Sequence, residues 1–135
     1  MCEAMTRKET ITLTVTSLLS ILFTIFHITD EISRGMEHAR LNMVAPLMVV
    51  ALWLYATLLL VERRSGLIII LLMSIIGIGI PIAHMTGAGL IGRRIANTGG
   101  IFFWVLTLFL LELNAAVAFV LSVQRLWRLR SRPAQ

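Results

Sequence analysis

The chain has 135 residues, of which 58% are hydrophobic and 14% are charged, whereas soluble domains are about half apolar and a quarter charged. A water-soluble fold of this size could not bury so much apolar surface, so lipid must cover much of the chain. The net charge of +5 does not indicate nucleic-acid binding, because the basic residues sit at the ends of apolar blocks and suit membrane topology. We therefore expect an integral membrane protein that contacts the lipid bilayer and no nucleic acid.

Four continuously apolar blocks follow one another along the chain. Each block holds about 18 to 23 residues, which suits a bilayer core of roughly 30 Å at 1.5 Å per helical residue. We expect transmembrane helices over residues 11–29, 41–61, 67–85 and 101–123. The first block lacks a small-residue cleavage site and is interpreted as an uncleaved helix. The prediction is an all-α single domain over residues 1–135, with four transmembrane helices in an up-down bundle.

The distribution of Lys and Arg residues predicts the orientation of this bundle. With the N-terminus inside, the inner segments hold eight of the 12 Lys and Arg residues, namely Arg7, Lys8, Arg63, Arg64, Arg125, Arg128, Arg130 and Arg132. The outer segments hold Arg34, Arg40, Arg93 and Arg94. Because cytoplasmic loops carry the excess of positive residues, both termini are expected in the cytoplasm. The expected location is a multi-pass position in a bacterial inner membrane.

The outer ends of the first and third helices carry polar residues that are costly in lipid. His27 and Glu31 are four residues apart and share one helix face, and Asp30 is also within reach. His84 is expected at the same depth on the third helix. Because Pro81 cannot donate to the preceding turn, we expect a kinked or partly unwound helix just before His84, which would open space in the outer half.

Two imidazoles and one or two carboxylates at one depth suggest a binding site. His27, Glu31 and His84 are predicted metal ligands, since imidazole with carboxylate suits zinc, iron or copper. The same groups could act as an acid–base pair, or two histidines could ligate a non-covalent haem, because no CxxCH motif is present. The alternative is that these side chains only contact water and neighbours at the interface.

Glu112 lies near the middle of the fourth helix, about 16 Å along the helix from its expected start at Ile101. No Lys or Arg is expected at that depth, so this acid is a functional candidate that either carries a proton or binds a ligand. The other polar side chains expected near this level are Ser17, Ser20, Tyr55 and Ser74. The alternative is a neutral acid that holds helices together by hydrogen bonds.

A polar stripe follows one face of the first helix, because its members recur in steps of three and four. It comprises Thr10, Thr14, Ser17, Ser20, Thr24, His27 and Glu31. The stripe could line a water-filled path. The favoured interpretation is helix packing, in which hydroxyl groups bond to their own backbone carbonyls.

Three functions remain open. The leading one is a binding protein or small enzyme with a pocket in the outer half of the bundle for a metal ion or a small apolar molecule. His27, Asp30, Glu31 and His84 would form its polar end, and Glu112 and Tyr55 are further ligand-binding candidates. The second is a proton-coupled small-molecule transporter that uses Glu112, working as a homo-oligomer because one bundle is narrow. The third is a structural or assembly subunit, since small residues on the fourth helix permit close helix contact. No GxSxG, HExxH or Walker signature predicts a catalytic mechanism.

Four short helices with one membrane-embedded glutamate resemble the small multidrug resistance transporters. In that family the essential glutamate lies in the first helix, whereas Glu112 lies in the fourth. The general plan is also similar to that of small four-helix membrane proteins such as the DoxX-like group, with which no motif is shared. The sequence therefore assigns no family.

Overall fold

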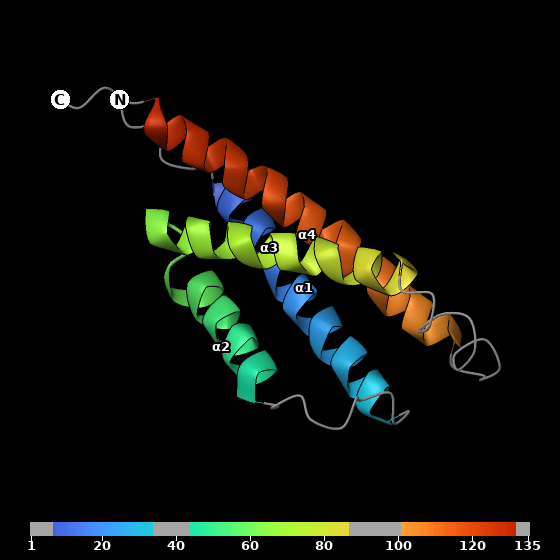
Figure 1. The fold of residues 1–135 in the computed structure, drawn as a ribbon. Helices are drawn as coiled ribbons and strands as arrows, with labels where there is room; N and C mark the ends of the chain where they lie inside the picture. Colours follow the sequence, from blue (N-terminus) through green and yellow to red (C-terminus); the bar gives the residue numbers. More distant parts are fainter. Residues whose placement is uncertain (1–6, 34–43, 87–100, 132–135) are drawn as a thin grey trace.

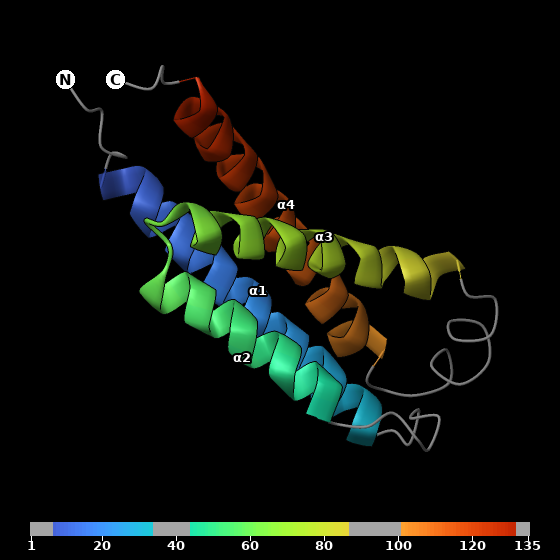
Figure 2. The same cartoon turned by 60° about the vertical axis from the view of Figure 1, so that its left-hand side comes forward.

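The described residues of the computed structural model are 7–33, 44–86 and 101–131, and within them every element is a helix. The helices are α1 (Arg7–Ser33), α2 (Val44–Leu59), α3 (Arg64–Thr86) and α4 (Ile101–Arg130). The predicted all-α class with four helices is thus confirmed. The chain alternates direction from one helix to the next, so the start of α1 and the end of α4 lie at the same end of the molecule (Figures 1 and 2).

Three helices extend beyond their expected apolar blocks. α1 is 27 residues long, α3 is 23 and α4 is 30, and the flanking Arg, Lys, Glu and Gln residues are good helix formers. α2 has 16 residues and ends at Leu59, two residues before the expected boundary. The expected first residues of this helix, 41–43, lie outside the described residues.

The turn between α2 and α3 is tight. The Arg63 amide donates to the Leu60 carbonyl at 2.8 Å, and the Leu67 amide then donates to the Arg63 carbonyl at 3.1 Å. Gly66 is required here, because a Cβ at this position would overlap the Leu60 carbonyl. The turn therefore lets α3 begin only a few residues after the end of α2.

α3 does not unwind at its proline. Pro81 lies inside the helix, which continues to Thr86. The expected partial unwinding before His84 is therefore wrong. The missing hydrogen bond of one proline is a local loss that the surrounding turns tolerate, and the Pro81 side chain is buried.

α4 is the central helix of the arrangement. It packs extensively on both α1 and α3, whereas α1 and α3 touch each other little; α2 packs mainly on α3 and also on α1. Small residues let α3 and α4 approach closely: a Cβ at Gly77 would lie 3.0 Å from the Cβ of Ala115. The fully buried side chains include Leu13, Trp53, Leu67, Ile70 and Leu111. The core between the helices is filled by these side chains.

The outer surface of the bundle is apolar along all four helices. Its exposed large hydrophobic residues include Val15 on α1, Leu58 on α2, Ile75 on α3 and Phe109 on α4. α1, α3 and α4 are each long and apolar enough to cross a membrane, and α2 is a shorter apolar helix. Exposed apolar surface of this kind is consistent with a membrane protein.

Candidate functional site

His27 lies near the end of α1 and is almost completely buried, with 2% of its surface exposed. Its ring packs against the indole of Trp104 on α4, with the ring centroids 5.5 Å apart. Next to it, Phe26 and Phe103 form a second aromatic pair with centroids 6.3 Å apart. The C-terminal end of α1 and the N-terminal end of α4 are therefore joined by two ring contacts.

Trp104 also reaches the third helix. It forms a small buried cluster with Leu108, and Ile80 of α3 packs against that cluster. The first turns of α4 lie between the C-terminal ends of α1 and α3 (Figures 1 and 2). Trp104 was not predicted as a site residue. It lies one turn after the start of the last apolar block, which is the same expected depth as His27.

The remaining outer candidates are only partly described. Asp30 is half-buried on α1. Glu31 and His84 lie in α1 and α3, but their side chains fall outside the described residues. Among the side chains that are described, no group of three or more His, Cys, Asp or Glu residues could hold a metal ion. The metal and haem hypotheses for His27, Glu31 and His84 therefore stay predictions.

A shallow groove lies beside this region, on the other side of α1. It has a volume of about 360 Å³ and opens between the last turns of α1 and the first turns of α2. Its lining consists of Ile25, Ile28, Thr29, Ile32, Pro46, Leu47 and Val50. Thr29 is the only polar residue of this lining, and its hydroxyl donates to the Ile25 carbonyl at 2.7 Å. The groove suits an apolar occupant.

Glu112 sits at the edge of the α4 packing face. The buried stripe of α4 includes Leu111, Ala115 and Ala118, and Glu112 is about 100° around the helix from Leu111. Its side chain is half-buried, and its carboxyl forms no hydrogen bond or ion pair with any residue that the structure describes. Glu112 therefore has no polar partner among the described residues. Lipid could not supply such a partner to an acid near the centre of an apolar helix.

The side of α4 on which Glu112 lies follows from helix geometry. Val123 comes eleven residues later, which is close to three full turns, so the two side chains share one side of α4. Val123 faces α3 across a groove, which places Glu112 on the α3 side of the bundle. Tyr55 is 50% exposed on α2 and points away from the core, so it does not share a layer with the buried serines.

The polar stripe of α1 serves packing, as favoured from the sequence. Two of its five hydroxyl groups donate to carbonyls one turn earlier in the same helix, Ser20 to Thr16 and Thr24 to Ser20. Ser17 is different, because it accepts a 2.8 Å hydrogen bond from the Trp53 indole nitrogen and contacts the Thr57 hydroxyl at 2.7 Å. This buried network joins α1 to α2.

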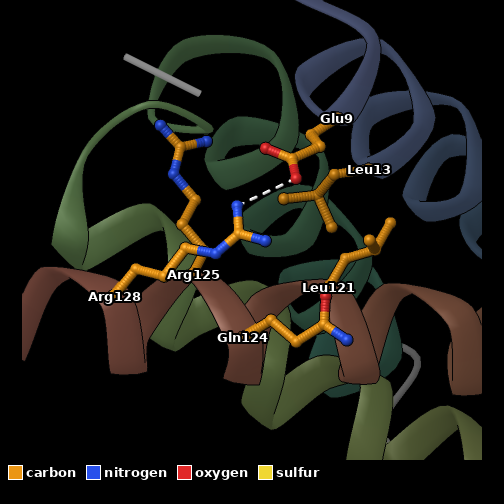
Figure 3. Close-up of a pocket in the computed structure, with 6 residues that line it drawn as sticks. All are labelled: Glu9, Leu13, Leu121, Gln124, Arg125 and Arg128. Carbon is orange, nitrogen blue, oxygen red and sulfur yellow. Dashed lines mark hydrogen bonds and ion pairs between the residues drawn. The ribbon is translucent and has the colours of Figure 1, made fainter. Parts of the chain in front are cut away.

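A second set of polar contacts lies at the opposite end, where α1 starts and α4 finishes. Arg128 forms a 2.9 Å ion pair with Glu9, and Arg125 donates to the Val61 carbonyl at 3.3 Å. These side chains surround a pocket of about 10 Å³ (Figure 3), which is room for about one water molecule. The contacts attach α4 to α1 and to the end of α2.

Comparison of the chain with protein-family models, with curated proteins and with solved structures gave no match.

Proposed function

We propose that the chain is a multi-pass protein of a bacterial inner membrane, with four spans and both termini in the cytoplasm. Three long apolar helices, the apolar outer surface and the alternating helix directions support four passes. The excess of Lys and Arg at the end where α1 starts and α4 finishes supports this orientation. α2 is about 24 Å long at 1.5 Å per residue, so it would span only a thinned bilayer or with help from its flanking residues.

We further propose that the protein exchanges protons for small apolar cations across this membrane, with Glu112 as the exchange site. The observation that carries the proposal is the half-buried Glu112 carboxyl, which has no polar partner among the described residues. One carboxyl can hold either a proton or an organic monocation, and the two occupants exclude each other. If the carboxyl binds a proton on one side of the membrane and an organic cation on the other, each cycle exchanges one proton for one organic cation.

The position of Glu112 favours a pair of chains as the working unit. The core of one bundle is filled with side chains such as Trp53 and Leu111, whereas Glu112 sits at the bundle flank. A second copy packed on this flank would cover both carboxyls and enclose a path between the two bundles. This arrangement would remove the cost of exposing an unpaired acid to lipid.

The test is uptake of tetraphenylphosphonium into liposomes that contain the purified chain and carry a pH gradient. We expect gradient-driven uptake by the native chain and none by Glu112→Gln, which keeps the shape of the side chain but cannot lose a proton. Glu62→Gln, which removes an exposed acid in the α2–α3 turn, is the matched control and should transport normally. Native uptake by Glu112→Gln would refute the proposal.

A second candidate function is binding of a small apolar molecule, such as a quinone or a lipid, at the outer end of the bundle. The groove between α1 and α2 favours it. Native mass spectrometry after gentle extraction should find a bound mass on the native chain. Leu47→Trp, which would fill the groove, should remove that mass, and an unchanged mass would contradict this function.

A further inference from the structure

A second groove lies at the opposite end of the molecule, between the first turns of α3 and the last turns of α4. Its volume is about 750 Å³. The groove exists because α3 and α4 cross and then separate toward this end (Figures 1 and 2). The described residues that line it come from α3, from α4 and from Ser131, which directly follows α4.

The walls of this groove are apolar and the mouth is basic. The walls consist of Ile68 and Leu71 from α3 and of Val123 and Leu126 from α4. Arg64, the first residue of α3, and Arg130, the last residue of α4, lie on the same groove. An apolar slot with a cationic mouth matches a molecule with a hydrocarbon chain and an anionic head.

The positive charge of this mouth is not balanced within the described chain. No acidic residue lines the groove, and neither Arg64 nor Arg130 has an ion-pair partner among the described residues. On the other side of α4 the situation differs, because Glu9 pairs with Arg128. The amino end of α3 adds the partial positive charge of its free amides. The groove therefore presents uncompensated positive charge to whatever enters it.

Trp127 marks the depth of the groove in the membrane. It lines the groove and is 72% exposed, whereas Trp53 and Trp104 are buried. Exposed tryptophan is favoured at the level of lipid head groups. Arg130, one turn along α4 from Trp127, and Arg64 on the same groove would then lie at the level of the bilayer phosphates, with the apolar walls extending toward the hydrocarbon.

We propose that this groove binds one anionic phospholipid, with its head-group phosphate between Arg64 and Arg130 and an acyl chain along the apolar walls. The proposal rests on insertion of the chain in a membrane, but not on transport through Glu112. Cytoplasmic leaflets are rich in anionic lipid, so the proposed orientation supplies this ligand on the correct side.

The test uses the full chain in phosphatidylcholine bilayers with a few per cent of brominated phosphatidylglycerol, at physiological salt. Bromine quenches nearby tryptophan, and Trp127 is the exposed reporter. We expect quenching well above that of a random lipid mixture, and only random quenching by brominated phosphatidylcholine. A Trp127→Phe chain should lose the excess quenching, because Trp53 and Trp104 are buried.

Two double variants separate the groove from general attraction by basic residues. Arg64→Gln with Arg130→Gln should lower the preference for phosphatidylglycerol about 25-fold, taking about fivefold per arginine. Arg7→Gln with Arg63→Gln removes the same charge from exposed positions that do not line the groove and should lower it less than about threefold. Equal losses in the two variants would overturn the proposal.

Two further measurements test the two parts of the ligand. Leu71→Trp, which would fill the apolar slot without changing charge, should abolish the excess quenching; an unchanged signal would overturn the proposed acyl-chain contact. Soluble glycerol phosphate at millimolar concentration should leave the signal unchanged. Full displacement by glycerol phosphate would instead make the groove a site for soluble phosphates and refute the lipid proposal.

Discussion

The hydrogen bond between Trp53 and Ser17 gives the sharpest test of the described packing. Ser17→Ala removes the hydroxyl that accepts the 2.8 Å bond from the indole nitrogen. Both residues are buried, with 1% of Trp53 exposed, so water cannot replace this acceptor. The Thr57 hydroxyl donates to the Trp53 carbonyl at 2.8 Å and therefore accepts from Ser17 in the native chain, so the same substitution also removes its hydrogen-bond donor.

The expected size of the effect follows from that lost acceptor. Leaving a buried donor unsatisfied costs about 1–3 kcal/mol in soluble proteins, and side-chain hydrogen bonds in membrane proteins average about 0.6 with a maximum near 1.7 kcal/mol. We therefore expect Ser17→Ala to lower the free energy of unfolding by about 1.5 kcal/mol, or roughly tenfold in the equilibrium constant.

The measurement is unfolding in mixed micelles by increasing SDS, followed by helical circular dichroism. Ser20→Ala is the matched control, because Ser20 is equally buried but bonds only to the Thr16 carbonyl of its own helix. Its expected loss is below about 0.5 kcal/mol. A double-mutant cycle of Ser17→Ala with Trp53→Phe should give a coupling of about 1 kcal/mol. Equal losses at Ser17 and Ser20, or zero coupling, would refute the network.

Three further predictions use the same unfolding measurement. Gly77→Leu should cost about 2 kcal/mol, because a Cβ there lies 3.0 Å from a side chain of α4, whereas Gly79 meets nothing within 4 Å and Gly79→Leu should be nearly neutral; equal costs would contradict the close contact. Glu9→Gln should cost less than about 0.5 kcal/mol, since Glu9 and Arg128 are 33% and 66% exposed; a loss above 1 kcal/mol would show a stronger ion pair. His27→Ala should cost about 2 kcal/mol through lost packing, and an unchanged stability would show that this ring is not buried.

The number and type of elements could be predicted from the sequence because four apolar blocks of membrane length leave few alternatives. The ends of the helices could not, since hydropathy marks where lipid begins rather than where helical hydrogen bonds stop. The end of α4 at Arg130 illustrates this difference: its last two turns are too basic to belong to an apolar block but remain helical.

The position of each candidate residue along its helix could be predicted from the sequence, but the side of the helix that faces the core could not. Residue counting placed Glu112 near the middle of its helix and His27 near the C-terminal end of α1, and the helix bounds agree with these two positions. The rotation of α4 could not be obtained that way, because it depends on α1 and α3 packing on the same helix at once. That packing brings Trp104 to His27 and leaves Glu112 on the flank.

The central position of α4 has a consequence for biosynthesis. Ribosomes make α4 after the other three helices, yet α1 and α3 touch each other little without it. Until α4 packs against them, the faces of α1 and α3 that surround it remain open, including the buried His27 and Ser74. We therefore expect a nascent chain with only three helices to be poorly packed, so that the arrival of α4 completes the core.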